Sequence, residues 1–297
     1  MDLLDKARFL LRKYGIRPRR SIGQSFCVDS SLLRRMVNYS AIDEEDVVLE
    51  VGAGFGFLTR ILSEVSKEVI AVELDHKLVK ALKEILRDKE NIQIVEGDCL
   101  NVHLPRFSKV VANPPYSISS PLVLNLLGGK FECAVLTLQR EFVEKLTAQR
   151  GSRTYGSLAV IAHYSAAVKA LEDVPRRSFY PHPNVDSTVV LIKPQKPLFE
   201  VGDEGLFFKI VRSSFTQRNR KLRNFLKVFI RNELKVNKGK ARMLVEDFPY
   251  LESRVYDLTP EEFGEISCKI HRIFVKRSST RKSKETSDYK LLLEGFL

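Results

Sequence analysis

A run of apolar residues that ends in alternating glycines constrains the fold of this chain more than any other feature. Residues 47–51 are mostly β-branched, which predicts a buried strand, and glycine then stands at positions 52, 54 and 56. Glycine accepts positive φ and lets the backbone come close to a ligand. Helical spacing resumes at residues 57–62. The segment therefore predicts a strand, a ligand-binding loop and a helix.

A second expected strand, residues 68–72, ends at Glu73, where a carboxylate can accept hydrogen bonds from both hydroxyls of an adenosine ribose. A dinucleotide fingerprint would need glycine at position 57, which is Phe57, and no Gly-Lys-Ser/Thr follows the loop, so a P-loop is excluded. The remaining pattern runs from Glu50 through the three glycines. It resembles the first motif of the methyltransferases that use S-adenosylmethionine, which implies this cofactor.

Two further strand ends supply polar residues to the same place. The expected strand 92–95 is followed by Asp98, and the expected strand 109–112 by Asn113. In doubly wound sheets, ligands bind beyond the carboxyl ends of the strands, so Glu73, Asp98 and Asn113 should converge on one crevice. Further elements are expected as strands at 131–138 and 186–192 and as helices at 3–14, 32–39, 76–88, 140–149 and 155–165.

The tetrapeptide Asn113-Pro114-Pro115-Tyr116 is a rigid piece of backbone, because both prolines have fixed φ and each pushes the preceding residue to an extended conformation. An amine conjugated to an aromatic ring is a poor nucleophile, since its lone pair is delocalised. The side-chain oxygen of Asn113 and the carbonyl of Pro114 could each accept one N–H, so that the lone pair turns toward a sulfonium methyl group. Tyr116 would stack on the base. We expect these residues at the reacting site.

The domain organisation follows from length, composition and prolines. With 297 residues and 44% hydrophobic content, the chain can form one large domain and a smaller one. Pro194 and Pro197 mark the boundary, so we expect an α/β domain at 1–195, a helical domain at 196–275 and a largely disordered tail at 276–297. The four cysteines and five histidines form no metal-binding pattern, so no metal is expected. Without an apolar run of membrane-spanning length or a secretory signal, a cytoplasmic protein is expected.

The positive charge of the chain is concentrated in two segments. The formal net charge is +12; residues 1–24 hold seven basic and two acidic side chains, and residues 209–242 hold twelve basic side chains against Glu233 alone. A concentrated basic surface binds phosphate backbones and releases counterions, which predicts a polyanionic partner and strong salt dependence.

At this point the chain resembles the KsgA family of ribosomal RNA adenine N6,N6-dimethyltransferases over roughly residues 8–275. Gly23-Gln24-Ser25-Phe26 resembles the cofactor segment of that family. The pattern Phe-x-Pro-x-Pro-x-Val-x-Ser at 179–187 resembles the segment whose Phe stacks on the target adenine, a role suited to a flipped-out base. The basic second-domain helix of the family is matched by Phe215, Arg218, Arg220, Lys221, Leu222 and Asn224.

The resemblance implies a Rossmann-like methyltransferase domain with a mostly parallel seven-stranded sheet and helices on both faces, followed by a small all-α domain. It implies S-adenosylmethionine as cofactor, with Asp98 accepting from its adenine amine. The catalytic residues would be Asn113, Pro114, Tyr116 and Phe179. The cofactor residues would be Gln24, Phe26, Glu50, Gly52, Gly54, Glu73, Leu74, Asp98, Cys99 and Asn113. The RNA contacts would be Arg218, Arg220, Lys221 and Arg223.

The implied activity is dimethylation of adjacent adenosines near the 3′ end of small-subunit ribosomal RNA during ribosome assembly, by a monomer that binds the RNA or the pre-ribosomal small subunit. Two residues depart from the family pattern: Ser25 replaces Asn, and Pro114 replaces Leu. The second change makes the tetrapeptide equal to that of DNA adenine and protein glutamine methyltransferases. DNA adenine methylation, glutamine methylation and a binding role in ribosome assembly or transcription therefore stay open as alternatives.

Overall fold

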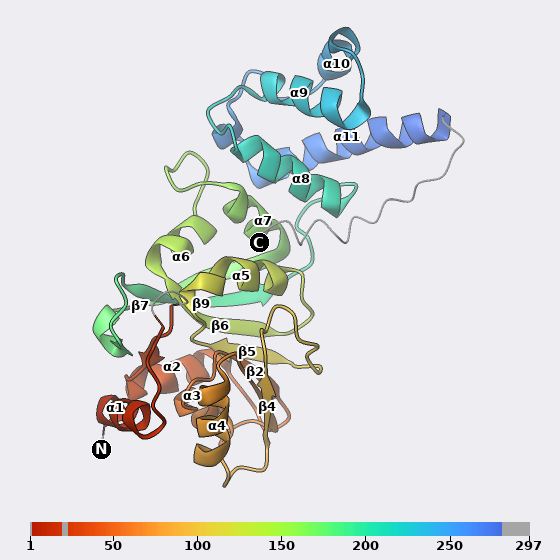
Figure 1. The fold of residues 1–297 in the computed structure, drawn as a ribbon. Coiled ribbons are helices and arrows are strands. Elements are labelled where there is room, and N and C mark those ends of the chain that lie inside the picture. The colour runs from red at the N-terminus through yellow and green to blue at the C-terminus, as the bar shows by residue number, and fades with distance from the viewer. Residues whose placement is uncertain (1, 20–22, 281–297) are drawn as a thin grey trace. The chain divides into compact units, whose positions relative to one another are not determined.

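The computed structural model describes residues 2–19 and 23–280 of the 297 (Figure 1). The chain divides into two compact units. The first comprises Met1–Glu144 and Ala166–Gln195, and the second comprises Lys145–Ser165 and Lys196–Leu297. The second unit thus includes the segment 145–165, which the sequence-based boundary assigned to the first domain.

The first unit alternates strands and helices, as the glycine-loop and strand patterns predicted. Its helices, the last of which runs into the second unit, are α1 (Leu3–Lys13), α2 (Ser30–Ser40), α3 (Phe57–Leu62), α4 (His76–Ile85), α5 (Ser119–Leu127) and α6 (Arg140–Leu146). Its strands are β1 (Phe26–Cys27), β2 (Val47–Val51), β3 (Glu68–Glu73), β4 (Ile92–Glu96), β5 (Lys109–Ala112), β6 (Cys133–Gln139), β7 (Ala166–Val174), β8 (Phe179–Tyr180) and β9 (Ser187–Pro194).

Seven of these strands form one sheet in the order β4-β3-β2-β5-β6-β9-β7. The strands from β4 to β6 are parallel to one another, and β9 pairs antiparallel with both of its neighbours. Chain order reverses between β2 and β5, so the carboxyl ends of β2, β3, β4 and β5 flank the point where ligands bind in doubly wound sheets. The mostly parallel seven-stranded sheet is confirmed.

Both faces of the central strands are covered. Val69 and Ala71 of β3 face a core that contains residues of α2, α3 and α4. Ile70 and Val72, which point to the opposite face, are also almost fully buried. Because successive side chains of a strand point to opposite faces, burial at every position requires cover on both sides.

Strand β7, helix α5 and the small sheet of β1 and β8 were not expected. β7 contains two adjacent alanines and three charged residues and has a bulge between Ala170 and Glu172. It lies at the edge of the sheet, where few side chains need to be buried, so its sequence lacks a clear strand pattern. Helix α5 begins two residues before Pro121, which is tolerated in a first turn. The two-stranded sheet of β1 and β8 depends on a pairing between Phe26 and Tyr180, which no local pattern specifies.

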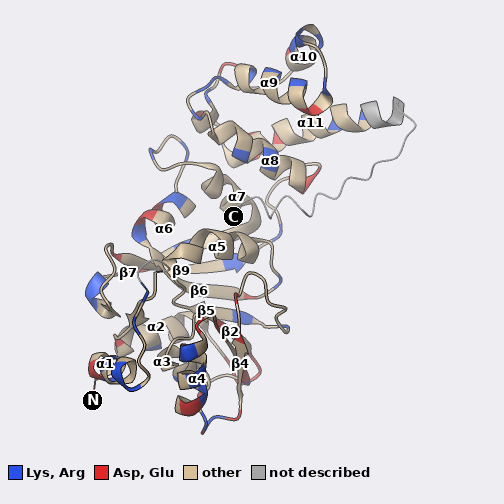
Figure 2. Cartoon of the chain, viewed as in Figure 1, with Lys and Arg blue, Asp and Glu red and all other residues tan. Residues whose placement is uncertain are grey.

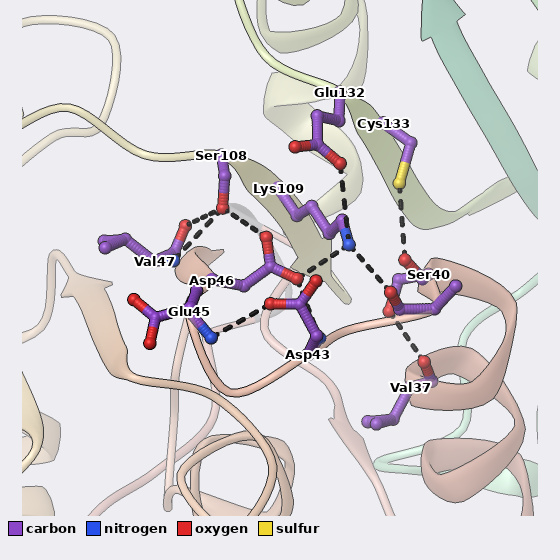
Figure 3. Close-up of polar contacts among 11 residues, drawn as sticks. Val37, Ser40, Asp43, Glu45, Asp46, Val47, Ser108, Lys109, Glu132 and Cys133 are labelled. Carbon is purple, nitrogen blue, oxygen red and sulfur yellow. Dashed lines mark hydrogen bonds and ion pairs between the residues drawn. The ribbon is translucent and has the colours of Figure 1, made fainter.

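A buried ion pair joins the amino ends of β2 and β5, at the edge of the sheet opposite the predicted crevice (Figure 3). Lys109 Nζ donates to Asp46 Oδ2 over 2.6 Å and to the carbonyl oxygen of Ala41 over 2.7 Å. Burial acts against the charged form of Asp46, but hydrogen bonds from Lys109, Asp43 and Ser108 lower the pKa of this carboxyl. The ion pair and the hydrogen bonds around it therefore hold the amino ends of β2 and β5 together.

The second unit is helical, as predicted for the second domain. It contains α7 (Ser157–Ser165), α8 (Glu204–Phe215), α9 (Leu222–Leu234), α10 (Lys238–Val245) and α11 (Pro260–Thr280). Phe207 of α8, Leu226 of α9 and Phe263 of α11 are fully buried in it. Helix α11 extends five residues into the segment expected to be a tail, and residues 281–297 of that segment lie outside the described part of the chain. No helix in the described residues is both long and apolar enough to span a membrane.

Candidate functional site

A cavity of about 180 Å³ lies beyond the carboxyl ends of β2, β3, β4 and β5. It is lined by every residue predicted to hold the cofactor except Glu50, namely Gln24, Phe26, Gly52, Gly54, Glu73, Leu74, Asp98, Cys99 and Asn113. We refer to it as the cofactor cavity. As expected from their positions after the strands, residues from distant parts of the sequence lie around one cavity.

The glycine loop forms one wall of this cavity. Gly52 and Gly54 have φ of +78° and +59°, which other residues rarely adopt. A Cβ atom at Gly52 would lie 3.1 Å from Cδ of Pro115, and one at Gly54 would lie 3.1 Å from the ring of Phe26. The loop needs glycine because the walls of the cavity approach its backbone closely.

Glu73 holds the loop and the next turn together. Its Oε2 accepts from the backbone N–H of Gly54 over 2.9 Å, and its Oε1 accepts from that of Asp75 over 2.9 Å. Burial raises the pKa of Glu73, although these two hydrogen bonds oppose the shift. Each carboxylate oxygen has a second lone pair, so Glu73 can still accept from a ribose hydroxyl.

Another part of the cavity lining combines an acceptor with apolar side chains. Asp98 accepts from the N–H of Leu100 over 3.0 Å and from Nδ2 of Asn101 over 2.8 Å, which fixes its carboxylate at the end of β4. Leu74 keeps 58% of its surface exposed beside the cavity, and burial raises the pKa of the neighbouring Cys99 thiol to about 12. An apolar slot with one fixed carboxylate suits a planar ring that carries an amine.

Glu50 lies just beneath the cofactor cavity. It is 2% exposed, and its Oε2 has no hydrogen-bond partner among the described residues. With Gly52, Gly54 and Asn113 it lines a small separate cavity of about 40 Å³. Burial raises the pKa of Glu50 to about 8, and the charge of Glu73 adds to the shift. A hydrogen bond with Thr59 opposes the shift, and the buried oxygen that has no partner in the described part of the chain favours a cationic group nearby.

A second cavity of about 480 Å³ adjoins the first, because Gly23, Gln24, Ser25 and Ser117 line both. Its other lining residues are Tyr116, Gln139 and residues 181–185. We refer to it as the acceptor cavity. Gln139 was missed in the sequence, although its place at the carboxyl end of β6 is the same signal that identified Asp98 and Asn113.

Asn113 stands in the wall of the cofactor cavity, at the start of the segment that leads to Tyr116 in the acceptor cavity. Its Oδ1 is buried and has no hydrogen-bond partner among the described residues. Leaving a buried acceptor unsatisfied costs about 1–3 kcal/mol, so an unpaired atom in the wall of a cavity is a candidate contact for a ligand. This oxygen is the acceptor expected to hold a substrate amine.

Two hydrogen bonds tie the walls of the acceptor cavity together. The hydroxyl groups of Tyr116 and Ser187 lie 2.5 Å apart, and Ser25 Oγ donates to the carbonyl oxygen of Pro181 over 2.6 Å. The serine that replaces the usual Asn therefore links the cofactor segment to the segment 179–187. Gln24 Oε1 accepts from the backbone N–H of Arg19 over 2.9 Å.

The structure does not bring two predicted catalytic groups to a cavity surface. Phe179 is 3% exposed and packs in the core of the first unit, paired with Cys27 across the small sheet. Pro114 is buried and is not a lining residue of either cavity. The roles of the Phe179 ring and the Pro114 carbonyl stay predictions.

The predicted RNA contacts lie in the second unit, where basic residues are spread over α8, α9 and α10 (Figure 2). Arg218 donates to the carbonyl oxygens of Arg153 and Ser152 and lies 5.5 Å from the ring centroid of Tyr256. Lys221 and Arg223 both form ion pairs with Glu252. The charge counted along residues 209–242 is therefore larger than the positive charge that is free of ion pairs in the second unit.

The metal-binding side chains, the cysteines and the sheet order bear on what class of protein this is. Among residues 2–19 and 23–280, no group of His, Cys, Asp or Glu side chains could hold a metal ion. All four cysteines are free thiols. The sheet order, the glycine loop and the two adjoining cavities define a Rossmann-like methyltransferase fold.

The family follows from comparison with known sequences. Residues 15–254 match the family described as ribosomal RNA adenine dimethylase. The chain is 41% identical over 274 residues to a protein named probable ribosomal RNA small subunit methyltransferase A from Methanopyrus kandleri, which covers 91% of this chain and 98% of that protein. A protein of the same name from Pyrococcus furiosus is 38% identical over 267 residues, 88% of this chain and 95% of its own. The chain belongs to the ribosomal RNA adenine dimethylase family.

Solved structures agree with this family. A dimethyladenosine transferase from Plasmodium falciparum is 26% identical, with a TM-score of 0.71 over 85% of this chain and 98% of its own. The 23S rRNA methyltransferase ErmE is also 26% identical, with a TM-score of 0.62 over 82% of this chain and 98% of its own. The fold and the family predicted from the sequence motifs are confirmed.

Proposed function

We propose that this protein transfers methyl groups from S-adenosylmethionine to N6 of adenosines in small-subunit ribosomal RNA, and that it methylates the same nitrogen twice. The observation that carries the proposal is the unpartnered Oδ1 of Asn113 in the wall of the cofactor cavity, on the segment that continues into the acceptor cavity. A neutral amide oxygen that lacks a partner is the group needed to accept from an exocyclic amine.

The lining of the cofactor cavity fits S-adenosylmethionine. Glu73 suits the ribose hydroxyls, and Asp98 with Leu74 suits the adenine ring. The backbone of Gly52 and Gly54 would lie along the rest of the molecule, close to the buried carboxyl of Glu50. When bound, this cofactor supplies a methyl group on a positively charged sulfur, which leaves as a neutral thioether.

The residues from Asn113, in the wall of the cofactor cavity, to Tyr116, in the acceptor cavity, orient the nucleophile. Asn113 Oδ1 and the Pro114 carbonyl accept the two N–H groups of adenine N6, which turns the nitrogen lone pair toward the methyl carbon. The ring of Tyr116 stacks on the base. After transfer the nitrogen is cationic and loses a proton readily, so these residues need to act only through orientation and hydrogen bonding.

RNA is favoured over DNA and protein by features outside the tetrapeptide. The acceptor cavity is walled by Pro181, Pro183 and Val185 of the segment 179–187, which resembles the adenine-binding segment of the rRNA enzymes. Solved structures with the same fold include a dimethyladenosine transferase and an rRNA methyltransferase. We also propose that Arg218, Arg220, Lys221 and Arg223 in the second unit contact phosphates of the RNA, and that the protein acts as a cytoplasmic monomer.

Labelled methyl transfer to three substrates tests the proposal. Unmethylated small subunits, naked small-subunit ribosomal RNA and duplex DNA are incubated side by side with labelled S-adenosylmethionine. We expect label in dimethyladenosine of the ribosomal substrates and none in DNA. Equal labelling of DNA would instead support the DNA adenine methyltransferase, and binding of small subunits without label would support a purely binding role.

A further inference from the structure

A further cavity in the first unit has a basic lining that no part of the proposed mechanism uses. It is an open groove of about 600 Å³ between α1 and the segment that follows it, closed on one side by Tyr180. Three arginines, Arg8, Arg12 and Arg17, line it and are exposed. We call it the arginine groove.

The arginines of the groove are largely uncompensated. Among the described residues, neither Arg12 nor Arg17 has a carboxylate within ion-pair distance, and Arg8 only reaches Asp5 at 4.0 Å. In the second unit, by contrast, Lys221 and Arg223 share Glu252. The charge at the groove is therefore available to a ligand.

Tyr180 gives the groove a fixed aromatic side. Its ring packs against a buried cluster that includes Leu11, Ile16 and Phe55. The guanidinium of Arg8 lies 5.3 Å from the centroid of this ring, within cation–π range. The groove thus combines the held guanidinium of Arg8 with two further exposed arginines and an apolar floor, a combination suited to phosphates of a nucleic acid strand.

Two connections of the chain join the groove to the acceptor cavity. Tyr180 lines the groove and the next residue, Pro181, lines the acceptor cavity. Pro18 lines the groove and Gly23, five residues on, lines the acceptor cavity. The groove therefore lies within a few nucleotides' length of the acceptor cavity, close enough for one strand to reach both.

We propose that the arginine groove binds the phosphodiester backbone of the RNA strand beside the nucleotide that is methylated. This rests on the proposed function for the identity of the polymer. The groove is then a second RNA site, in the same unit as the reacting groups. It would fix the register of the strand, since phosphate contacts position a nucleic acid without reading its sequence.

A salt series on matched variants tests the groove. The probe is a fluorescently labelled, single-stranded 12-nucleotide oligoadenylate, and its binding is followed by anisotropy from low to moderate salt. Each phosphate contact in a single strand contributes about 0.7 to the slope of log affinity against log salt, so Arg12→Ala/Arg17→Ala should flatten the slope by about 1.4. Arg12→Lys/Arg17→Lys, which keeps both charges, should restore most of it.

The control removes the same charge elsewhere in the first unit. Arg106 and Lys130 are exposed, and they precede β5 and β6 at the amino ends of those strands, away from the cavities. Arg106→Ala/Lys130→Ala should leave the slope at the parent value. An unchanged slope in the groove variant, an equal loss in the control, or no binding of the probe by the parent would each overturn the proposal.

Methyl transfer is measured on the same preparations. A parent that labels no ribosomal RNA would refute the proposed function, while the comparison of slopes would still decide whether the groove binds RNA. Where the parent is active, the groove variant should raise KM for small-subunit RNA and leave kcat close to the parent value.

Discussion

The hydroxyl oxygen of Tyr116 lies 2.5 Å from Oγ of Ser187, and this contact joins the segment of Asn113 to the strand that follows the Phe179 segment. Ser187 is fully buried at the first position of β9. The contact explains why a hydroxyl residue ends the pattern 179–187: it fixes the ring expected to stack on the substrate base.

A double-mutant cycle should detect this contact. Tyr116→Phe leaves the buried hydroxyl of Ser187 without its partner, and Ser187→Ala leaves the half-buried hydroxyl of Tyr116 without its own, so each should lower the free energy of unfolding by about 1–3 kcal/mol. The double variant should cost less than the sum, with a coupling of at least about 0.5 kcal/mol. Urea unfolding of the four proteins measures it. Strictly additive losses would mean that the two hydroxyls act independently.

Stability of the ligand-free protein should depend on Glu50 as the pH changes. The pKa of Glu50 is raised from 4.5 to about 8 by burial, so between these values the folded state holds a proton that the unfolded state has lost. The free energy of unfolding contributed by this residue is therefore present below pH 4.5 and falls as pH rises, by up to about 1.4 kcal/mol per pH unit.

Glu50→Gln removes this titration and keeps the shape of the side chain. The stability of the variant relative to the parent should rise steadily from pH 5 to pH 8, and urea unfolding at several pH values gives the difference. Because all other groups are common to both proteins, their titration cancels. A difference that stays constant over this range would show that Glu50 is already ionised in the folded protein.

The assigned cofactor residues should be needed for binding S-adenosylmethionine. A hydrogen bond to a charged group contributes about 1.5–3 kcal/mol, so Asp98→Ala and Glu73→Ala should each raise Kd at least about tenfold in calorimetry. Glu132→Ala is the control, because this exposed carboxylate lies beside Lys109 at the opposite edge of the sheet (Figure 3). Parent-like affinity in both test variants would mean that the cofactor binds elsewhere.

Glu252 should weaken RNA binding by the second unit. Its carboxylate pairs with Lys221 and Arg223, two of the four residues proposed to contact phosphates. Glu252→Gln releases both charges, so affinity for a small-subunit RNA fragment should rise about threefold or more at low salt, with a steeper salt slope. Glu246→Gln, next to Arg242 on the same unit, serves as the control. If the two variants bind alike, Lys221 and Arg223 do not face RNA.

The parts of the site that could be predicted from the sequence depend on one topological rule. Glu73 is the last residue of β3, Asp98 lies two residues after the end of β4, and Asn113 directly follows β5; the carboxyl ends of these parallel strands meet at one edge. Their positions relative to the strands were enough to predict that they lie together, without knowledge of a ligand or of any distance. The same rule, applied to β6, would also have identified Gln139.

The parts that could not be predicted depend on pairings between distant residues. Phe26 meets Tyr180 across a sheet of two-residue strands, and this pairing forms one side of the arginine groove and buries Phe179. Glu252 lies 31 residues from Lys221, so a count of charges along 209–242 could not include it. Strand β7 was missed because an edge strand with alanine and charged residues has little β propensity.

The last prediction concerns the second methyl transfer. In the first transfer, adenine N6 has two N–H groups and can use both acceptors, Asn113 Oδ1 and the Pro114 carbonyl. After it, one N–H remains, and the new methyl group must occupy the direction of the lost hydrogen. The aromatic groups around the base then carry more of the orientation, since stacking contributes about 1–3 kcal/mol per base.

Phe179 should therefore affect the second transfer more than the first. Phe179→Ala would also open a cavity in the core and cost about 3–5 kcal/mol of stability, so Phe179→Leu is the better variant, because it keeps apolar volume and removes the ring. We expect Phe179→Leu to accumulate monomethyladenosine and Asn113→Ala to suppress even the first transfer. Mass spectrometry of nucleosides, at saturating cofactor over a time course, measures the ratio of mono- to dimethyladenosine.

Thermal melting confirms that each variant is folded. A Phe179→Leu protein with the parent's ratio of mono- to dimethyladenosine throughout would confine Phe179 to the packing seen in the structure, and a parent that stops after one methyl group would remove the dimethylation itself.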